Sequence, residues 1–335
     1  MRERVLYGPG TAPSEGPGSI ASGAAQERPG ISVVVPVMNE RESLGPLYDR
    51  LRNVLDGLCG GYELIFVDDG STDGSFEALR RLHEADGRVR VIRFSRNFGQ
   101  TAAFSAGFAE AKADIIVTLD ADLQNDPADI PSLLDKMAHG YDLVSGWRVK
   151  RRDSLLTRRL PSRAANWLIR QVTGVQLHDY GCSLKAYRSE LVKQIRLYGE
   201  LHRFIPALAS RMGARIAEVP VSHYPRIYGR SKYNMSRTFK VIPDVLAVRF
   251  LLSHAASTAK PTGIRGLLGE LVMRTHYRVR ERPAYVVREI LQHGPVDKHG
   301  TLQSETLTTF SGRARNTQGG DHVATRQSIV AESLQ

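Results

Sequence analysis

The fold and the candidate site of this chain are best interpreted by working outward from the stretch Thr118-Leu119-Asp120-Ala121-Asp122-Leu123-Gln124-Asn125-Asp126-Pro127. It follows the apolar run 115–117, which predicts a buried parallel strand. In an extended segment residues i and i+2 point the same way, so Asp120 and Asp122 can face one cation with the Gln124 amide in reach. This incomplete ligand set suits Mg²⁺ or Mn²⁺, with phosphate oxygens and water completing the shell. Alternatively, the two aspartates only cap the helix that follows.

Strands and helices alternate on both sides of this stretch. The predicted strands are 31–36, 63–67, 89–94, 114–119, 142–146 and 216–221. Between them apolar residues recur at helical spacing, as in Leu44, Leu47 and Leu51. The alternation predicts an α/β fold with a mostly parallel sheet and right-handed crossovers. The polar loop 68–75 directly follows a strand, which is where open α/β sheets place their ligands.

Charge and composition restrict the class of partner. The 335 residues carry a net charge of +11, which favours nucleic acid, anionic lipid or phosphorylated substrates. Cys59 and Cys182 are far apart and have no metal-site spacing, which favours a reduced compartment. The chain has no dinucleotide fingerprint and no Walker loop, so hydride transfer and ATP hydrolysis lack support. It has no run of about 18 apolar residues and no signal peptide, so we expect no membrane span.

Residues 147–170 form a strongly basic segment. Eight arginines or lysines accompany one acid, Asp153, and aliphatic and aromatic residues such as Trp167 lie among them. Such a segment can lie on an anionic membrane surface. An ordinary solvated helix face is the alternative. No nucleic-acid-binding motif accompanies the charges, so we expect no nucleic-acid partner.

Two later loops carry further candidate residues. Asp179 lies in a loop that enters a strand, where it is either catalytic or a capping and hydrogen-bonding residue. Arg226, Arg230 and Lys232 surround Gly229, and three cations in a flexible loop suit a clamp that closes over a pyrophosphate. As an isolated feature the same cations could be surface charge.

The ends of the chain are predicted to be less ordered than its centre. The predicted boundaries are 1–30 for a disordered leader, 31–235 for the α/β domain, 236–252 for an amphipathic helix and 253–335 for a weakly structured tail. Within the tail, 263–273 and 285–291 could form short helices. Residues after about 295 are rich in Gly, Thr, Ser, Gln and Arg, which predicts disorder.

The order of these motifs resembles a known family. Val35-Pro36-Val37-Met38-Asn39-Glu40 followed by Val67-Asp68-Asp69-Gly70-Ser71-Thr72-Asp73 is similar to the opening of a family 2 inverting glycosyltransferase. Five later motifs make the chain similar to the polyprenyl-phosphate glycosyltransferases, which include dolichyl-phosphate mannose synthases and the undecaprenyl-phosphate aminoarabinose transferases. They are Arg96-Asn97-Phe98-Gly99-Gln100, 119–124, the arginine-rich 148–163, Asp179-Tyr180-Gly181-Cys182 and Arg230-Ser231-Lys232-Tyr233. The resemblance is collinear over about 31–252.

The resemblance implies a GT-A fold, with a mostly parallel sheet flanked by helices, C-terminal amphipathic helices and a disordered tail. It also implies metal-dependent, inverting transfer of a sugar from a UDP- or GDP-linked nucleotide-sugar, with the UDP-linked donor favoured. The acceptor would be a polyprenyl phosphate at the cytoplasmic face of the membrane. The expected partners are therefore the donor, the lipid phosphate and an anionic membrane surface.

The resemblance also implies residue roles at the matching positions. Residues expected to line the nucleotide pocket are Pro36, Asn39, Glu40, Asp68 and Asp69. Residues expected to hold Mg²⁺ or Mn²⁺ on the diphosphate are Asp120, Asp122 and Gln124, of which Asp120 also counts as a donor-binding residue. The loop that closes over the donor would contribute Arg230 and Lys232. Candidates for the lipid phosphate are Arg148, Arg159 and Ser162. The candidate catalytic residues are Asp122, Arg148 and Asp179, with Asp179 acting as a positioning residue or as a base.

The chain departs from the family pattern after the predicted helix 236–252. Many bacterial members continue into two transmembrane helices, whereas residues 253–261 here are polar. We therefore expect a peripheral protein that docks on the cytoplasmic membrane face through basic segments, or one that needs a membrane partner subunit. Two other functions stay open. One is a soluble glycosyltransferase of the same fold that acts on a saccharide or protein acceptor, and the other is a non-catalytic module that binds nucleotide-sugar or a membrane surface.

Overall fold

The computed structural model describes residues 29–149, 169–171, 173–197, 199, 201–228, 285–293 and 304–307. The strands are β1 (Ile31–Val37), β2 (Tyr62–Asp68), β3 (Val89–Phe94), β4 (Ile115–Thr118), β5 (Leu143–Trp147), β6 (Lys185–Arg188), β7 (Ile216–Pro220), β8 (Val287–His293) and β9 (Ser304–Leu307). The α-helices are α1 (Arg41–Leu55), α2 (Ser75–Ala85), α3 (Gln100–Glu110), α4 (Ile130–Ala138), α6 (Ser189–Gln194) and α7 (Ile205–Arg211). Two 3₁₀ turns are η1 (Pro127–Asp129) and η3 (Leu201–Phe204).

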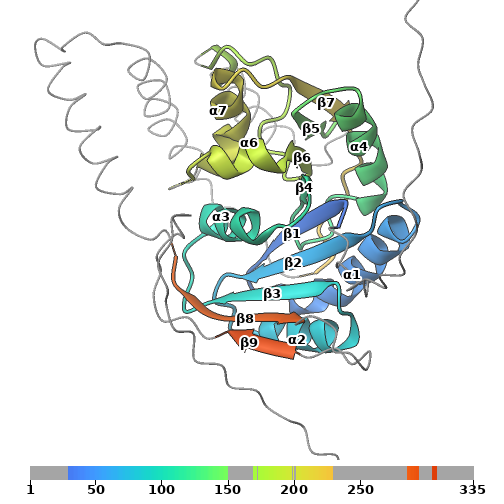
Figure 1. Cartoon of the computed structure of the whole chain (residues 1–335), viewed down its shortest axis with the longest axis vertical. Helices are drawn as coiled ribbons and strands as arrows, with labels where there is room; N and C mark the ends of the chain where they lie inside the picture. The colour runs from blue at the N-terminus through green and yellow to red at the C-terminus, as the bar shows by residue number, and fades with distance from the viewer. Residues whose placement is uncertain are drawn as a thin grey trace, which may run out of the picture.

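One mixed sheet organises these elements, with the strand order β7-β5-β6-β4-β1-β2-β3-β8-β9 (Figure 1). The central strands β4, β1, β2 and β3 are parallel, and so is the pair β5 and β7. The predicted α/β class with a central sheet and flanking helices is confirmed. The sheet is less parallel than expected, because β6 runs antiparallel to both of its neighbours and β8 runs antiparallel to β3. Side-chain alternation places a residue on a face but does not encode the direction of its strand.

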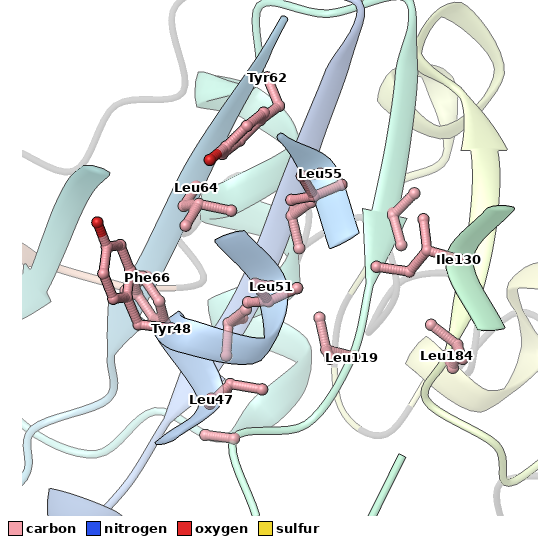
Figure 2. Packing of buried hydrophobic residues seen from close by; sticks show 14 of the residues in the cluster. Leu47, Tyr48, Leu51, Leu55, Tyr62, Leu64, Phe66, Leu119, Ile130 and Leu184 are labelled. Carbon is pink, nitrogen blue, oxygen red and sulfur yellow. The ribbon is translucent and has the colours of Figure 1, made fainter. Parts of the chain in front are cut away.

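Both faces of the central sheet are buried, and successive residues of a strand alternate between two cores. Val33 and Val35 of β1 pack on the side of α1, α2 and α4, whereas Val34 packs on the side of α3, α6 and α7. Figure 2 shows Leu47 and Leu51 of α1 packed over the first of these faces. Strands buried on both faces explain the continuous apolar runs in the sequence.

Helix α3 packs unusually close to the sheet. A Cβ atom at Gly107 would overlap the side chain of Val34 in β1. The helix is otherwise rich in alanine, and small residues let its backbone approach the strands. This close packing fixes the position of the N-terminal end of α3, which faces the site described below.

The C-terminal part of the chain contributes strands where a helix was expected. The predicted short helix at 285–291 is wrong, because Val287–His293 forms β8 and pairs with the edge of β3. Arg93 Nη1 of β3 donates to Glu289 Oε1 at 3.0 Å, and Tyr285 stacks on Phe94 with ring centroids 4.9 Å apart. A strand edge with open backbone hydrogen bonds explains this choice over a helix.

Several predicted segments lie in parts of the chain that the structure does not describe. The leader up to residue 28, the amphipathic helix at 236–252 and the short helix at 263–273 lie outside the described residues. Among the helices that the structure does describe, none combines the length and the apolar character needed to cross a bilayer.

Candidate active site

The loops that follow β1, β2 and β4 meet at one edge of the sheet. These strands are parallel neighbours, so their carboxyl ends point the same way and their polar loops gather there. The predicted site residues that the fold brings to this edge are Asn39, Glu40, Asp68, Asp69, Asp120 and Asp122. Pro36 lies just before them, still inside β1 and opposite Val67 of β2.

The β1 and β2 loops are tied together by short hydrogen bonds. The Asn39 backbone N–H donates to Ser71 Oγ at 2.9 Å, and the Thr72 N–H donates to Asn39 Oδ1 at 2.8 Å. The Glu40 N–H donates to Ser75 Oγ at 3.0 Å. Asn39 has a φ of +52°, a left-handed conformation that Asn adopts more readily than most residues. The Asn39 side chain therefore shapes the predicted nucleotide loop.

The two carboxylates at the end of β2 have different surroundings. Asp69 accepts hydrogen bonds from the Phe98 and Gly99 backbone N–H groups at 2.6 and 2.9 Å, so it anchors the loop that leads into α3. Asp68 Oδ2 is 3.8 Å from Arg93 Nε and has no hydrogen-bond partner within the described residues. Burial raises the pKa of both carboxyl groups. Asp68 Oδ2 is thus a buried oxygen with an arginine nearby, whereas Asp69 is engaged by the loop before α3, and the nucleotide-binding roles of both residues stay predictions.

Asp120 and Asp122 form a carboxylate pair directly after β4. Gln100 Nε2, at the start of α3, donates to Asp120 Oδ1 at 2.6 Å. Burial, followed by the charge of Asp122, raises the pKa of Asp120 to about 6. Two carboxylates that repel each other in a poorly solvated place favour a bound cation.

Arg226 supplies a cation at this pair. Its Nη2 donates to Asp122 Oδ2 at 2.7 Å, and its Nη1 donates to Glu40 Oε1 at 2.8 Å. The Arg226 side chain is only 19% exposed. The sequence placed Arg226 in the cationic loop but gave no sign of this contact, because 104 residues separate it from Asp122.

The amide of Gln124 points to a different partner from the one predicted. Gln124 Nε2 lies 3.4 Å from the Tyr224 carbonyl, and the Gln124 backbone N–H donates to Asp122 Oδ1 at 3.1 Å. Leu123 has a φ of +60°, a conformation that costs a leucine about 1 to 2 kcal/mol. Such strain tends to collect at functional sites. The role of Gln124 as a metal ligand stays a prediction.

Arg148 and Asp179 form a bidentate ion pair. Arg148 Nε donates to Asp179 Oδ2 at 2.6 Å, and Arg148 Nη2 donates to Asp179 Oδ1 at 2.9 Å. The Gly181 N–H also donates to Asp179 Oδ1, at 3.1 Å, and Asp179 is only 3% exposed. A carboxylate engaged on both oxygens orients the arginine, so the geometry favours a positioning role for Asp179 over a base.

Four predicted site residues lie outside the part of the chain that the structure describes. They are Arg159, Ser162, Arg230 and Lys232. Their roles stay predictions.

A small polar cavity next to Asp120 was not anticipated from the sequence. Its walls include Gln100 of α3, Lys185 of β6, and His202 and Arg203 of η3. These residues come from separate elements and carry no common spacing, so no local pattern in the sequence could have grouped them. The arrangement places two further cations close to the carboxylate pair.

Comparison with known proteins shows that the chain is similar to glycosyltransferases. Residues 32–196 match the family described as Glycosyl transferase family 2. The chain is 47% identical over 248 residues to a dodecaprenyl-phosphate galacturonate synthase from Rhizobium johnstonii, covering 72% of this chain and 73% of that protein. It is 35% identical over 327 residues to an undecaprenyl-phosphate 4-deoxy-4-formamido-L-arabinose transferase from Pseudomonas paraeruginosa, covering 84% and 96%.

The fold is also found among solved structures. Glucosyl-3-phosphoglycerate synthase from Mycobacterium tuberculosis, in complex with phosphoglyceric acid, superposes with a TM-score of 0.51 at 22% identity. The match covers 70% of this chain and 83% of that one. The GT-A fold expected from the sequence is thereby confirmed.

Proposed function

Because this chain belongs to glycosyl transferase family 2, we propose that it transfers a sugar from a nucleotide-sugar to the phosphate of a polyprenol, with inversion. The donor is UDP-linked rather than GDP-linked in this proposal. The two relatives named above have a dodecaprenyl or an undecaprenyl phosphate in their names, which supports the acceptor class. That the chain is a glycosyltransferase follows from the family itself.

One observation carries the proposal at the level of the site. The carboxylate pair Asp120 and Asp122 lies at the same sheet edge as Asp68 and the loop after β1. A nucleotide bound over the β1 and β2 loops would extend its diphosphate toward the pair. This is the arrangement that departure of a nucleoside diphosphate requires, since negative charge develops on its oxygens.

The pair fits a divalent cation such as Mg²⁺ or Mn²⁺. Both groups are hard oxygen donors, and burial, followed by the charge of Asp122, raises the pKa of Asp120, so a cation bound there would stabilise the ionised pair. No cluster of three acidic, histidine or cysteine side chains suited to a metal occurs among the described residues, so donor phosphates and water would complete the shell. When bound, the ion would stabilise the charge of the leaving diphosphate. Gln124 is proposed as a third protein ligand.

On the acceptor side, Asp179 holds the Arg148 guanidinium in a fixed orientation. We propose that Arg148, with Arg159 and Ser162, aligns the lipid phosphate for attack on the anomeric carbon. A phosphate is already anionic at neutral pH, so the attack needs no strong base. Arg230 and Lys232 would close over the donor diphosphate.

The reaction is proposed to take place at the cytoplasmic face of the membrane, with the enzyme bound peripherally or through a membrane partner subunit. The net charge of +11 and the basic segment 147–170 support this location. The sugar is left open by the relatives, one of which is named for a galacturonate and the other for a formamido-arabinose.

Release of nucleoside diphosphate from UDP- and GDP-sugars tests the proposal. We expect release that depends on both Mg²⁺ or Mn²⁺ and a short polyprenyl phosphate. Asp122→Asn should lower kcat by about 100-fold or more, whereas Asp135→Asn, on the exposed face of α4, should leave it unchanged. Release that does not require the lipid would contradict the acceptor, and release that persists in chelator would contradict the metal.

A further inference from the structure

The small cavity beside Asp120 has a volume of about 20 Å³. A space of this size holds a single water molecule or one small polar substituent, not a whole sugar ring. It is enclosed between the start of α3, the end of β4, β6 and η3, with Gln100, Lys185 and Arg203 among its walls. The cavity is therefore a side chamber of the donor site.

Two basic side chains, Lys185 and Arg203, line this chamber together with Asp120. Within the described residues, neither Lys185 nor Arg203 forms an ion pair. Lys185 is 4% exposed, and its Nζ donates to the backbone carbonyls of Cys182 and Tyr180, which are neutral. Burial lowers the pKa of Lys185, so an anion in the chamber would stabilise its charged form.

The other polar groups of the chamber do not cancel these charges. His202 Nδ1 lies 2.7 Å from Thr101 Oγ1, and burial lowers the pKa of His202 to about 3, so its ring is neutral. Asp120 is the acidic lining residue, and it already forms the carboxylate pair that faces the diphosphate. The chamber thus has two basic side chains, and its one acidic side chain, Asp120, belongs to the carboxylate pair.

We propose that the chamber receives an anionic substituent of the donor sugar, the carboxylate of a uronic acid, with Arg203 as the specificity-determining cation. The proposal rests on the proposed function, since the sugar is bonded directly to the diphosphate and so lies next to Asp120. A planar carboxylate matches the two parallel N–H groups of a guanidinium. A hydroxymethyl group in the same place would leave both basic side chains without an anionic partner, which is costly for the buried Lys185. The charge of the chamber selects the uronic acid over a neutral sugar.

Donor binding by the full-length protein tests this inference without requiring turnover. Calorimetric titration in Mn²⁺ compares UDP-galacturonate with UDP-galactose, which differ only in a carboxylate against a hydroxymethyl group. We expect UDP-galacturonate to bind about 10- to 100-fold more tightly. Arg203→Met should weaken binding of UDP-galacturonate by a similar factor and change that of UDP-galactose far less. Arg211→Met, at the exposed end of α7, is the matched control and should change neither.

Three outcomes would overturn the inference. They are equal affinity of the wild-type protein for both donors, an equal loss for both donors in Arg203→Met, and an Arg203→Met variant that changes only the KM for polyprenyl phosphate. The last would place the lipid phosphate, not a sugar carboxylate, beside Arg203. Arg203→Lys keeps the charge and should retain part of the preference, which guards against misfolding of the methionine variant. Selective donor binding without lipid-dependent transfer would sustain this inference and reject the proposed acceptor.

Discussion

Arg226 lies between two carboxylates of the candidate donor site. Its guanidinium contacts both Asp122 and Glu40, so it places a positive charge at the proposed metal-binding pair. A divalent cation bound as proposed would therefore compete with the positive charge of Arg226. We expect Arg226→Met to bind Mn²⁺ about 5- to 10-fold more tightly than the wild-type protein when no donor is present.

Titration calorimetry or the electron paramagnetic resonance signal of free Mn²⁺ measures this change directly. Arg50→Met is the control, because Arg50 is exposed on α1 and lines the same surface groove as Arg226. An unchanged Mn²⁺ dissociation constant in Arg226→Met would show that the ion pair does not compete with the metal.

The ion pair between Arg148 and Asp179 leads to a second expectation at this scale. Asp179→Asn loses the charge that orients Arg148, so kcat/KM for the lipid acceptor should fall about 10- to 100-fold. In the proposed positioning role Asp179 takes no proton, so the pH dependence of kcat should keep its shape. Loss of the ascending limb of the pH profile in this variant would identify Asp179 as the base instead.

Sequence reasoning at the residue scale brought together candidate site residues that are close in the chain, and their functional roles stay predictions. Asp120 and Asp122 were predicted as a pair because two positions along a strand end fix their common direction. The contact of Arg226 with Asp122, and the grouping of Arg203 with Lys185, depend on loop paths that no local pattern records. Asp179 was correctly located in a loop, but only its bidentate contact separates positioning from catalysis.

At the scale of elements, β8 is held to the rest of the protein by a pair of histidines. The His83 and His293 rings are 4.1 Å apart, and His293 Nε2 lies 2.8 Å from the His83 carbonyl. His83 is 2% exposed, and its Nδ1 lies 2.7 Å from the Val89 carbonyl. Burial, with a smaller contribution from His293, lowers the pKa of His83, while the hydrogen bond to the Val89 carbonyl and, less strongly, Glu84 oppose this effect. Docking of β8 therefore favours a neutral His83.

Thermodynamic linkage between protonation of His83 and folding fixes the sign of the pH dependence of stability. The pKa of His83 is lowered in the folded state, so below the ordinary value of 6.5 the unfolded chain binds a proton that the folded protein resists. The free energy of unfolding should fall as the pH drops below about 6.5. We expect His83→Gln to reduce the loss of Tm between pH 7 and pH 5 by a few degrees.

Thermal unfolding across this pH range provides the measurement. His139→Gln is the matched control, since the His139 side chain is 65% exposed on α4. Equal pH dependence in all three proteins would show that His83 does not couple protonation to folding.

Helices and strands up to β7 follow the predicted order, because apolar spacing and buried runs are local signals. Strand β8 was predicted as a helix, since a short run of mixed polar and apolar residues is compatible with both the helical and the strand repeat. Only pairing with the open edge of β3 decides between them. Strand direction was missed for β6 for the same physical reason. Secondary structure that depends on neighbouring residues is predictable from the sequence, whereas strand pairing with a distant segment is not.

At the scale of the whole molecule, the net charge of +11 should act as a long-range attraction to anionic membranes. Binding to vesicles that contain an anionic phospholipid should weaken with added salt, since the screening length falls from about 10 Å at 0.1 M to about 3 Å at 1 M. Removing two charges from the basic segment, as Arg151→Gln with Arg152→Gln, should lower the affinity about 30-fold at low salt.

Co-sedimentation with vesicles measures both the salt dependence of binding and the loss of affinity in the double variant. The pair Arg80→Gln with Arg81→Gln removes the same charge from the exposed side of α2 and should have a much smaller effect. Sedimentation that does not respond to salt, or equal losses in the two double variants, would contradict docking through the basic segment.

Pairing of β3 with β8 also has a consequence for synthesis on the ribosome. Strand β3 ends at Phe94 and β8 begins at Val287, 193 positions later. At roughly 5 to 20 residues per second, the edge of β3 emerges about 10 to 40 s before its partner exists. For that interval the nascent chain presents an unpaired strand edge, which is a template for association with other chains. Protection of this edge by a chaperone during translation would then matter more for the yield of folded enzyme than the final stability of the sheet.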